Sequence, residues 1–160
     1  MSRIQLALNV DDVEAATKFY SALFGTEPAK TRPGYANFAV ANPPLKLVLL
    51  ENPGQGGTLN HLGVEMESVD SVDAEQTRLA DAGLASVDER GSTCCYAKQD
   101  KFWVEGAPDG ERWEVYTVLA DSPSFFAEAS DDPACCGGST SEAAPAPGVT
   151  GAGAAAASCC

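Results

Sequence analysis

The sequence has few basic residues, no long apolar run and a single histidine. Lys and Arg number 10 against 23 Asp and Glu, which gives a net charge of −13 over 160 residues. No basic stripe is available to bind nucleic acid or an anionic membrane surface. No apolar run approaches the roughly 18 residues of a membrane span, and the first residues lack the core of a signal peptide. We therefore expect a soluble, cytoplasmic protein with no nucleic-acid or membrane partner.

Two common catalytic motifs are also missing. A Ser-His-acid triad would have to use His61, and no nucleophile elbow of the form Gly-x-Ser-x-Gly occurs. The glycines around Gly54 and Gly151 lack the strand-to-helix context of a phosphate-binding loop. These absences argue against serine hydrolases and nucleotide enzymes.

The six cysteines form three adjacent pairs, Cys94-Cys95, Cys135-Cys136 and Cys159-Cys160. A secreted disulfide framework spreads its cysteines along the chain, and neighbouring cysteines bond each other poorly because the small ring is strained. The zinc-finger spacing of two cysteines separated by two residues is absent. The pairs therefore favour a soft metal or metalloid ligand over a structural bridge.

The composition changes near residue 121. Ala, Gly, Ser and Pro fill 26 of the last 40 positions, which contain no Lys or Arg. Such a segment buries too little apolar surface to offset the entropy lost on ordering. We predict a folded domain over residues 1–120, long enough to hold a core, and a flexible tail over 121–160 that carries two cysteine pairs.

The domain contains a weak internal repeat. Residues 4–10 and 60–66 alternate apolar and polar side chains in the same phase, as half-buried strands do. About three further strands are expected in each copy, among them 35–41, 45–51, 101–105 and 111–118. The pattern predicts an α+β fold in which two β-α-β-β-β modules, at about 1–52 and 58–120, form one cupped mixed sheet.

A helix is predicted after the first strand of each copy. The first begins at Asp11, with Glu14 three residues later as in a capping box, and ends at Gly25. The second begins near Asp70 and stops at Gly83. The apolar stripes of both helices are expected to cover one face of the sheet.

Polar side chains then gather on the other face of the sheet. Alternation places Gln5, His61 and Glu114 there, and the repeat puts Gln5 and His61 at equivalent positions. An amide, an imidazole and a carboxylate approximate the facial triad of two histidines and one carboxylate that holds iron(II). A lone histidine among apolar residues is more often a hydrogen-bonded core residue, so both interpretations of His61 stay open on this evidence.

The most distinctive stretches of the domain are 4–8, 32–38, 44–49, 59–65, 93–97 and 113–116. They resemble the vicinal oxygen chelate superfamily, which includes glyoxalases, extradiol dioxygenases and bleomycin-resistance proteins. Within it, the resemblance is closer to cadmium-induced proteins and ferrous-dependent carbon–arsenic lyases. It extends over roughly residues 1–119, and the Cys94-Cys95 pair together with the Asn-His-Leu-Gly-Val run at 60–64 makes it specific.

The resemblance implies an oxygen-dependent lyase that detoxifies trivalent organoarsenicals such as methylarsenite, releasing arsenite and formaldehyde. By position, Gln5, His61 and Glu114 would hold Fe(2+), and Cys94 and Cys95 would bind the arsenic of the substrate. The glutamine departs from the histidine of the wider superfamily and leaves the identity of the metal open. The implied partners are the organoarsenical and O2, and a homodimer is left open as the assembly.

The fourth metal position of glyoxalases falls near residues 45–49. The side chains of the matching phase there are apolar except Lys46, which argues against glyoxalase-type octahedral chemistry.

Two-thiol binding makes demands on the local backbone. Adjacent residues of a regular strand face opposite sides, so Cys94 and Cys95 need a loop or kink, which the Gly-Ser-Thr at 91–93 is expected to provide. Lys98 and Lys101 are expected to lower the thiol pKa. Three alternatives stay open: a protein that sequesters cadmium or arsenite without turnover, a drug-binding module of the same fold, and two cysteines that are only small buried hydrophobes.

Overall fold

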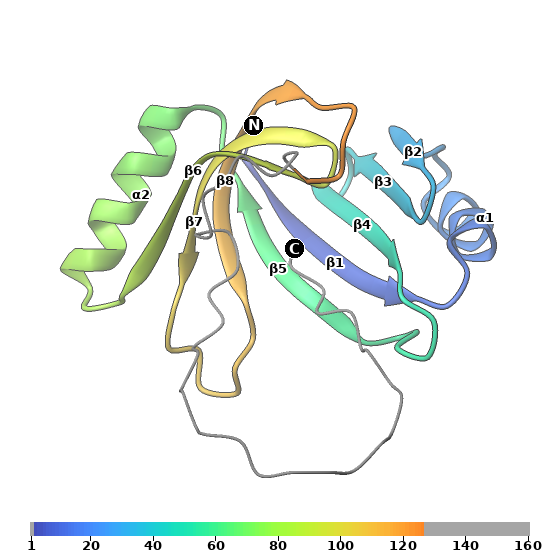
Figure 1. Ribbon diagram of the computed structural model, residues 1–160, viewed down its shortest axis with the longest axis horizontal. Helices are drawn as coiled ribbons and strands as arrows, with labels where there is room; N and C mark the ends of the chain where they lie inside the picture. Colours follow the sequence, from blue (N-terminus) through green and yellow to red (C-terminus); the bar gives the residue numbers. More distant parts are fainter. Residues whose placement is uncertain (1, 127–160) are drawn as a thin grey trace, which may run out of the picture.

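Eight strands form one curled sheet in the order β2-β3-β4-β1-β5-β8-β7-β6, flanked by two helices (Figure 1). The computed structural model describes residues 2–126. In chain order the elements are β1 (Arg3–Val10), α1 (Val13–Phe24), β2 (Lys30–Arg32), β3 (Tyr35–Val40), β4 (Leu45–Glu51), β5 (Leu59–Glu65), α2 (Val69–Asp81), β6 (Ser86–Cys94), β7 (Ala97–Val104) and β8 (Trp113–Asp121). The predicted α+β fold of two β-α-β-β-β modules is confirmed.

The two modules meet at the centre of the sheet. Strands β1 and β5 pair antiparallel there, while β1 pairs with β4 and β5 pairs with β8 in parallel. In the central ladder Gln5 lies opposite Gly63 and Ala7 lies opposite His61. A twofold rotation between the strands would exchange these two pairs. This is the symmetry that the sequence repeat predicted when it aligned residue 5 with 61 and 7 with 63.

The start of α1 differs by one residue from the prediction. The N-cap is Asp12, whose carboxylate accepts the backbone N–H of Ala15. Asp11 instead accepts the N–H groups of Gly54 and Gly56 in the loop between the modules. Asp11 therefore holds the intermodule loop against the end of β1, and it is not available as a cap.

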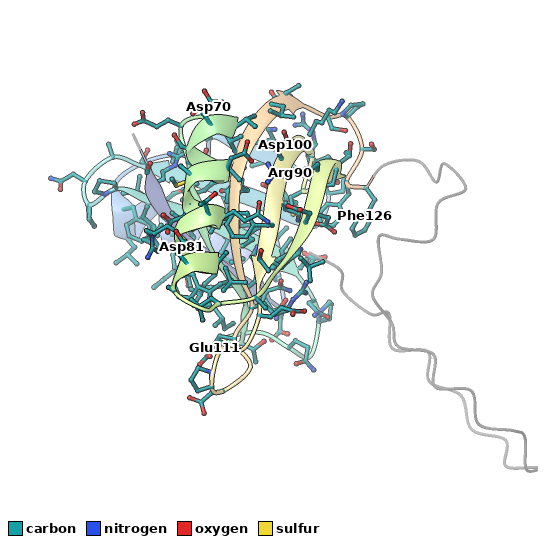
Figure 2. All side chains as sticks on the ribbon, turned by 90° about the vertical axis from the view of Figure 1, so that its left-hand side faces the viewer. Asp70, Asp81, Arg90, Asp100, Glu111 and Phe126 are labelled. Atoms are coloured by element: carbon teal, nitrogen blue, oxygen red, sulfur yellow. The ribbon has the colours of Figure 1, made fainter. Side chains whose placement is uncertain are left out.

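The helices bury apolar side chains against the outer face of the sheet. Helix α1 covers Phe38, Leu47 and Leu49 of β3 and β4. Helix α2 buries Val72 and Leu79 against β7 and β8. Figure 2 shows α2 lying along the sheet with Asp70 and Asp81 near its two ends. This layer is the hydrophobic core, as the alternation predicted.

The inner face is polar and buried. The polar side chains on this face with 7% exposure or less are Gln5, Asn9, His61, Gln99, Lys101 and Glu114. Burying so many polar groups is costly unless they are paired, so this face marks the candidate site. Within residues 2–126 no helix is long and apolar enough to cross a membrane.

The chain continues past β8 over the open edge of this face. Phe125 stacks edge-on against Tyr35 and Tyr96, and Phe126 forms an isolated bridge with Cys94. The predicted flexible tail lies, from residue 127 onward, outside the described residues.

Candidate metal and thiol site

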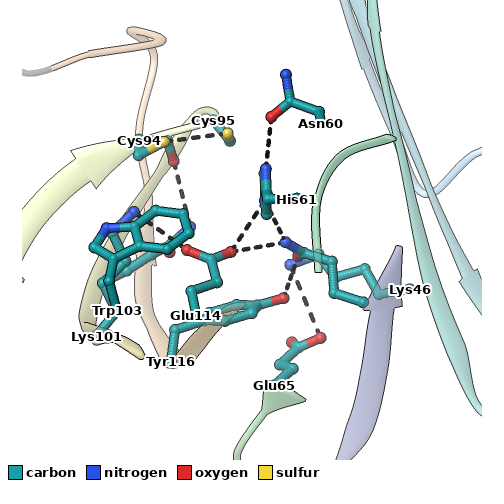
Figure 3. Close-up of polar contacts among 12 residues, drawn as sticks. Lys46, Asn60, His61, Glu65, Cys94, Cys95, Lys101, Trp103, Glu114 and Tyr116 are labelled. Atoms are coloured by element: carbon teal, nitrogen blue, oxygen red, sulfur yellow. Dashed lines mark hydrogen bonds and ion pairs between the residues drawn. The ribbon is translucent and has the colours of Figure 1, made fainter. Parts of the chain in front are cut away.

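Three side chains from the centre of the sheet converge on the inner face (Figure 3). Gln5 Nε2 lies 2.9 Å from His61 Nε2 and 2.7 Å from Glu114 Oε1. The His61 Nε2 and Glu114 Oε1 atoms are 3.3 Å apart. Gln5, His61 and Glu114 are only 4%, 2% and 4% exposed. The structure thus brings together the three residues that the sequence analysis singled out, from β1, β5 and β8.

The hydrogen bonds of His61 fix its tautomer. An amide nitrogen only donates, so the Gln5 contact requires His61 Nε2 to be the acceptor. The proton is then on Nδ1, which donates to Asn60 Oδ1 at 2.7 Å. Asn60 is held in turn, because its Nδ2 donates to Asn9 Oδ1 at 3.0 Å. The lone pair of Nε2 therefore points into the cluster, as it does in a metal-binding histidine.

The amide of Gln5 has its nitrogen directed inward. Its Oε1 accepts a hydrogen bond of 2.5 Å from the Tyr116 hydroxyl, on the side away from His61 and Glu114. An amide nitrogen is not a metal ligand, so a cation at this point would require the amide to turn over. The Tyr116 hydroxyl suits both orientations, because it can donate to the oxygen or accept from the nitrogen.

Glu114 is ionised despite its burial. Burial alone would raise its pKa, but the charge of Lys101 is the largest opposing effect, and the pKa of Glu114 is lowered to about 2. Lys101 Nζ donates to Glu114 Oε2 at 3.2 Å and lies 2.9 Å from Glu89 Oε2. The second oxygen of Glu114 is thus occupied, which leaves Oε1 facing Gln5 and His61.

Close packing of the cluster depends on Gly63. A Cβ atom at this position would lie 3.2 Å from Gln5 Cβ and 3.2 Å from Glu114 Cγ. Contacts of that length force the neighbours to move by tenths of an ångström. The glycine of the second copy therefore lets the stems of Gln5 and Glu114 come together.

The spacing of His61 Nε2 and Glu114 Oε1 fits two ligands of one metal ion. Two ligand atoms held at right angles about 2.1 Å from a metal are about 3.0 Å apart, and these two atoms are 3.3 Å apart. The 2.9 and 2.7 Å separations run to Gln5 Nε2, so the Gln5 oxygen would take that place only after the amide turns over. Within the described chain no group of three or more His, Cys, Asp and Glu side chains is arranged to hold a metal. The cluster has only two such side chains, so an ion here would depend on the Gln5 amide oxygen.

The two adjacent cysteines lie at a hairpin turn. Cys94 is the last residue of β6, and Cys95 and Tyr96 form the two-residue connection to β7. Their φ angles are 54° and 61°, the left-handed conformation that both central residues of a type I′ turn require. The turn brings the two sulfur atoms to 3.2 Å, well beyond the roughly 2.0 Å of a disulfide bond. The predicted kink is therefore the turn itself, and residues 91–93 belong to β6.

Lys101 lowers the thiol pKa of Cys95 as predicted, but other effects outweigh it. Burial is the largest effect and Glu114 adds to it, so the pKa of Cys95 is raised to about 12. Lys101 and Lys46 oppose the increase without cancelling it. Lys98 is exposed and does not contribute. Cys95 is therefore a neutral thiol at pH 7.

We expect alkylation of Cys95 to show this raised pKa. At pH 8 a thiol with a pKa near 12 has about a thousandfold less thiolate than one with a pKa near 9. The iodoacetamide rate should therefore keep rising above pH 9 in the folded protein, and should level off near pH 9 in urea. The measurement is mass spectrometry of the tryptic peptide 91–98 in a Cys94→Ser background, and a plateau near pH 9 in the folded state would contradict the expectation.

A cavity of about 190 Å³ connects the two cysteines with the donor cluster. Gln5, Glu114, Cys94, Cys95 and Lys46 all line it, whereas His61 does not. Aromatic side chains pack beside Cys95 at the rim, with ring centroids of Tyr35 and Tyr96 5.3 Å apart. The volume lies below the usual range for drug-sized ligands and suits a small molecule.

Sequence reasoning did not assign roles to Asn60, Tyr116 or Lys46. Each carried a signal: Asn60 precedes the only histidine, Tyr116 shares the phase of Glu114, and Lys46 interrupts an otherwise apolar strand. Tyr96 gave no signal, because an aromatic residue is a poor candidate for a left-handed turn.

Comparisons with known proteins agree with this architecture. Residues 3–115 match the model of the Glyoxalase/Bleomycin resistance protein/Dioxygenase superfamily. The chain is 66% identical over 145 residues to the cadmium-induced protein CadI of Mycobacterium tuberculosis, covering 86% of this chain and 95% of the relative. It is 58% identical over 137 residues to the trivalent organoarsenical cleaving enzyme of Thermomonospora curvata, covering 85% and 89%.

Two solved structures share the fold at low identity. The Mn(II)-bound glyoxalase from Novosphingobium aromaticivorans is 21% identical with a TM-score of 0.51, over 76% of this chain and 42% of that one. An extradiol ring-cleaving dioxygenase from B. fuscum is 18% identical with a TM-score of 0.52, over 74% and 33%. The family match spans most of the domain, and the cupped sheet is the one that these proteins share. The chain therefore belongs to the glyoxalase/bleomycin resistance protein/dioxygenase superfamily, also called the vicinal oxygen chelate superfamily.

Proposed function

We propose that this protein is an iron(II)- and O2-dependent lyase that cleaves the carbon–arsenic bond of trivalent organoarsenicals. One observation supports it best: Cys94, Cys95, Gln5 and Glu114 line the same small cavity. His61 lies behind that surface and contacts the Gln5 amide. The 58% identity to an enzyme named for the same activity agrees with it. Gln5, His61 and Glu114 would hold the iron, and Cys94 and Cys95 would hold the arsenic.

The protein's contribution to a metal site is to prepare the ligands. Asn60 keeps the proton on His61 Nδ1. Lys101 keeps Glu114 ionised and holds its Oε2 atom, which leaves Oε1 facing the cluster. Iron(II), when bound, would supply the activation of O2. Tyr116 would hold the Gln5 amide after it has turned its oxygen inward. None of these groups needs to move by more than a rotation about a side-chain bond.

The turn at Cys95 and Tyr96 prepares the substrate ligands. Methylarsenite has one carbon and two hydroxyl groups on arsenic. When both cysteines are reduced, each thiol would replace one hydroxyl, so that two sulfur–arsenic bonds form and two water molecules leave. The displaced hydroxyl takes the thiol proton, so a neutral Cys95 is compatible with this exchange. Two points of attachment fix the arsenic and leave its methyl group directed into the cavity, which lowers the entropic part of the barrier.

The overall reaction balances without a further reductant. CH3As(OH)2 and O2 give As(OH)3 and HCHO. The methyl carbon is oxidised to formaldehyde, O2 is the oxidant, and arsenic stays trivalent. The cavity of about 190 Å³ accepts a substrate of this size.

The decisive experiment is aerobic incubation of the iron(II)-loaded full chain with methylarsenite, followed by arsenic speciation and a formaldehyde assay. We expect one arsenite and one formaldehyde for each O2 consumed. Methylarsenite that is recovered unchanged and bound to the protein would instead identify a sequestering protein. That alternative has its own support, since a 66% identical relative is named for induction by cadmium.

A further inference from the structure

The cavity is richer in cations than the rest of the protein. The chain has a net charge of −13, yet Arg3, Lys30 and Lys46 line the cavity beside an equal number of carboxylates. Two of these cations are hydrogen-bonded to a carboxylate, whereas Lys46 has only a longer ion pair. Arg3 Nε lies 2.7 Å from Glu65 Oε2, and Lys30 binds the carboxylate of Asp121. Lys46 is different.

The ammonium group of Lys46 makes no hydrogen bond to any residue in the range 2–126. Its side chain is 12% exposed, and its nearest carboxylate oxygen, Glu65 Oε2, is 3.8 Å away and already bound by Arg3. Its remaining contact is the ring of Tyr116, 4.9 Å from Nζ. Burial lowers the pKa of Lys46, while Glu65 and Glu114 raise it, so a further anion close to Nζ would stabilise the ammonium form. Lys101 shows the contrast, because it contacts two carboxylates at 2.9 and 3.2 Å.

Lys46 also has a defined place relative to the proposed substrate. It is the register partner of Gln5, on the neighbouring strand β4. Figure 3 shows Lys46 and the cysteine pair on different sides of Glu114. Its charge influences both Cys95 and Glu114, so it lies within electrostatic range of each. Lys46 and both cysteines line the same cavity, so an organic group on an arsenic atom held by the cysteines would share that cavity with Lys46.

Resting on the proposed function, we propose that Lys46 forms an anion subsite for the organic group of the substrate. The ligand class is a trivalent organoarsenical whose organic group ends in a carboxylate on a short chain. The carboxylate would accept hydrogen bonds from Nζ, a charge-assisted contact in a site that excludes water. Methylarsenite would fill the arsenic position only and leave Lys46 with its long ion pair to Glu65.

The test uses the metal-free full chain, so that binding is measured without turnover. Dissociation constants are compared for the methyl, carboxymethyl and 2-carboxyethyl derivatives of As(OH)2, with intrinsic tryptophan fluorescence as the signal. We expect at least one carboxylated compound to bind about tenfold more tightly than the methyl compound. The chain length that gives the lower dissociation constant indicates which spacing between arsenic and carboxylate fits the distance to Nζ.

Variants assign the effect to Lys46. Lys46→Met should remove the preference, Lys46→Arg should retain it, and the exposed-lysine control Lys98→Met should leave it unchanged. Acetate that competes with the carboxylated compound, and not with the methyl compound, would show that the subsite also takes a free anion. A preference that is absent in the parent, or unchanged in a folded Lys46→Met protein, overturns the proposal.

The outcome is separable from the proposed function. If methylarsenite fails to bind the thiols or is not cleaved aerobically, the lyase proposal fails. If it binds and is cleaved, but a carboxylate adds no affinity, only the anion subsite fails.

Discussion

Replacing His61 with alanine is expected to remove iron(II) binding and turnover together. His61 is the only histidine in the chain, so no other imidazole can take its place. The variant would leave Glu114 and the neutral Gln5 amide as donors, with Lys101 still bound to Glu114. Loss of an outer partner of a metal ligand already costs 10–100-fold in affinity. Loss of the ligand itself should cost at least about a hundredfold.

The measurement is equilibrium dialysis against iron(II) without oxygen, with circular dichroism as the check on folding. Val72→Ala is the matched control, because Val72 is fully buried on the outer face under α2 and does not line the cavity. It should lower stability by a few kcal/mol and leave iron affinity unchanged. A His61→Ala protein that binds one iron with parental affinity would show that the metal lies elsewhere.

The arrangement of the donor cluster was predictable because side chains alternate between the two faces of a strand, so the sequence shows which residues share a face. Alternation in β1 and β5 separated the polar inner face from the apolar outer face, and the repeat aligned Gln5 with His61. Glu114 followed from the same rule applied to β8. These predictions needed only the period of a strand and the symmetry of two copies.

Two edge strands were harder to locate from the sequence. Strand β2 has three residues, and β6 is largely exposed, so neither carries an alternating apolar face. Without such a face, hydrophobic periodicity has nothing to detect. Their pairing is set by β3 and β7, which the sequence places more clearly.

The chemistry around Cys95 depended on tertiary contacts that spacing does not encode. Sequence proximity suggested that Lys98 would lower the thiol pKa. In the fold Lys98 is exposed, and burial and Glu114 dominate Cys95 instead. The same limit applies to the left-handed turn, since propensity gives Cys95 and Tyr96 no advantage there. Local strain at such a turn is typical of functional sites, where the surroundings impose the conformation.

The second large effect concerns how many thiols hold the arsenic. With both cysteines in the thiol form, a sulfur–sulfur separation of 3.2 Å suits one atom bonded to both. A monomethylated trivalent arsenical has two exchangeable groups and can be held at two points. A dimethylated one has a single exchangeable group, so it binds through one sulfur and its methyl groups rotate. Losing that orientation should lower the rate of arsenic release about a hundredfold.

Cys94→Ser and Cys95→Ser should each cause a loss of similar size on the monomethylated substrate, because a hydroxyl is a poor ligand for a soft metalloid. Each serine variant should also lose the preference for the monomethylated over the dimethylated substrate, because one thiol holds either substrate at one point only. Thr93→Ser, a neighbouring change in β6 at a residue that does not line the cavity, is the control and should keep the parental ratio of rates. The comparison is the initial rate of arsenic release from the two substrates in all four proteins. Equal rates on both substrates in the parent, or full activity in either cysteine variant, would exclude two-thiol binding of the arsenic.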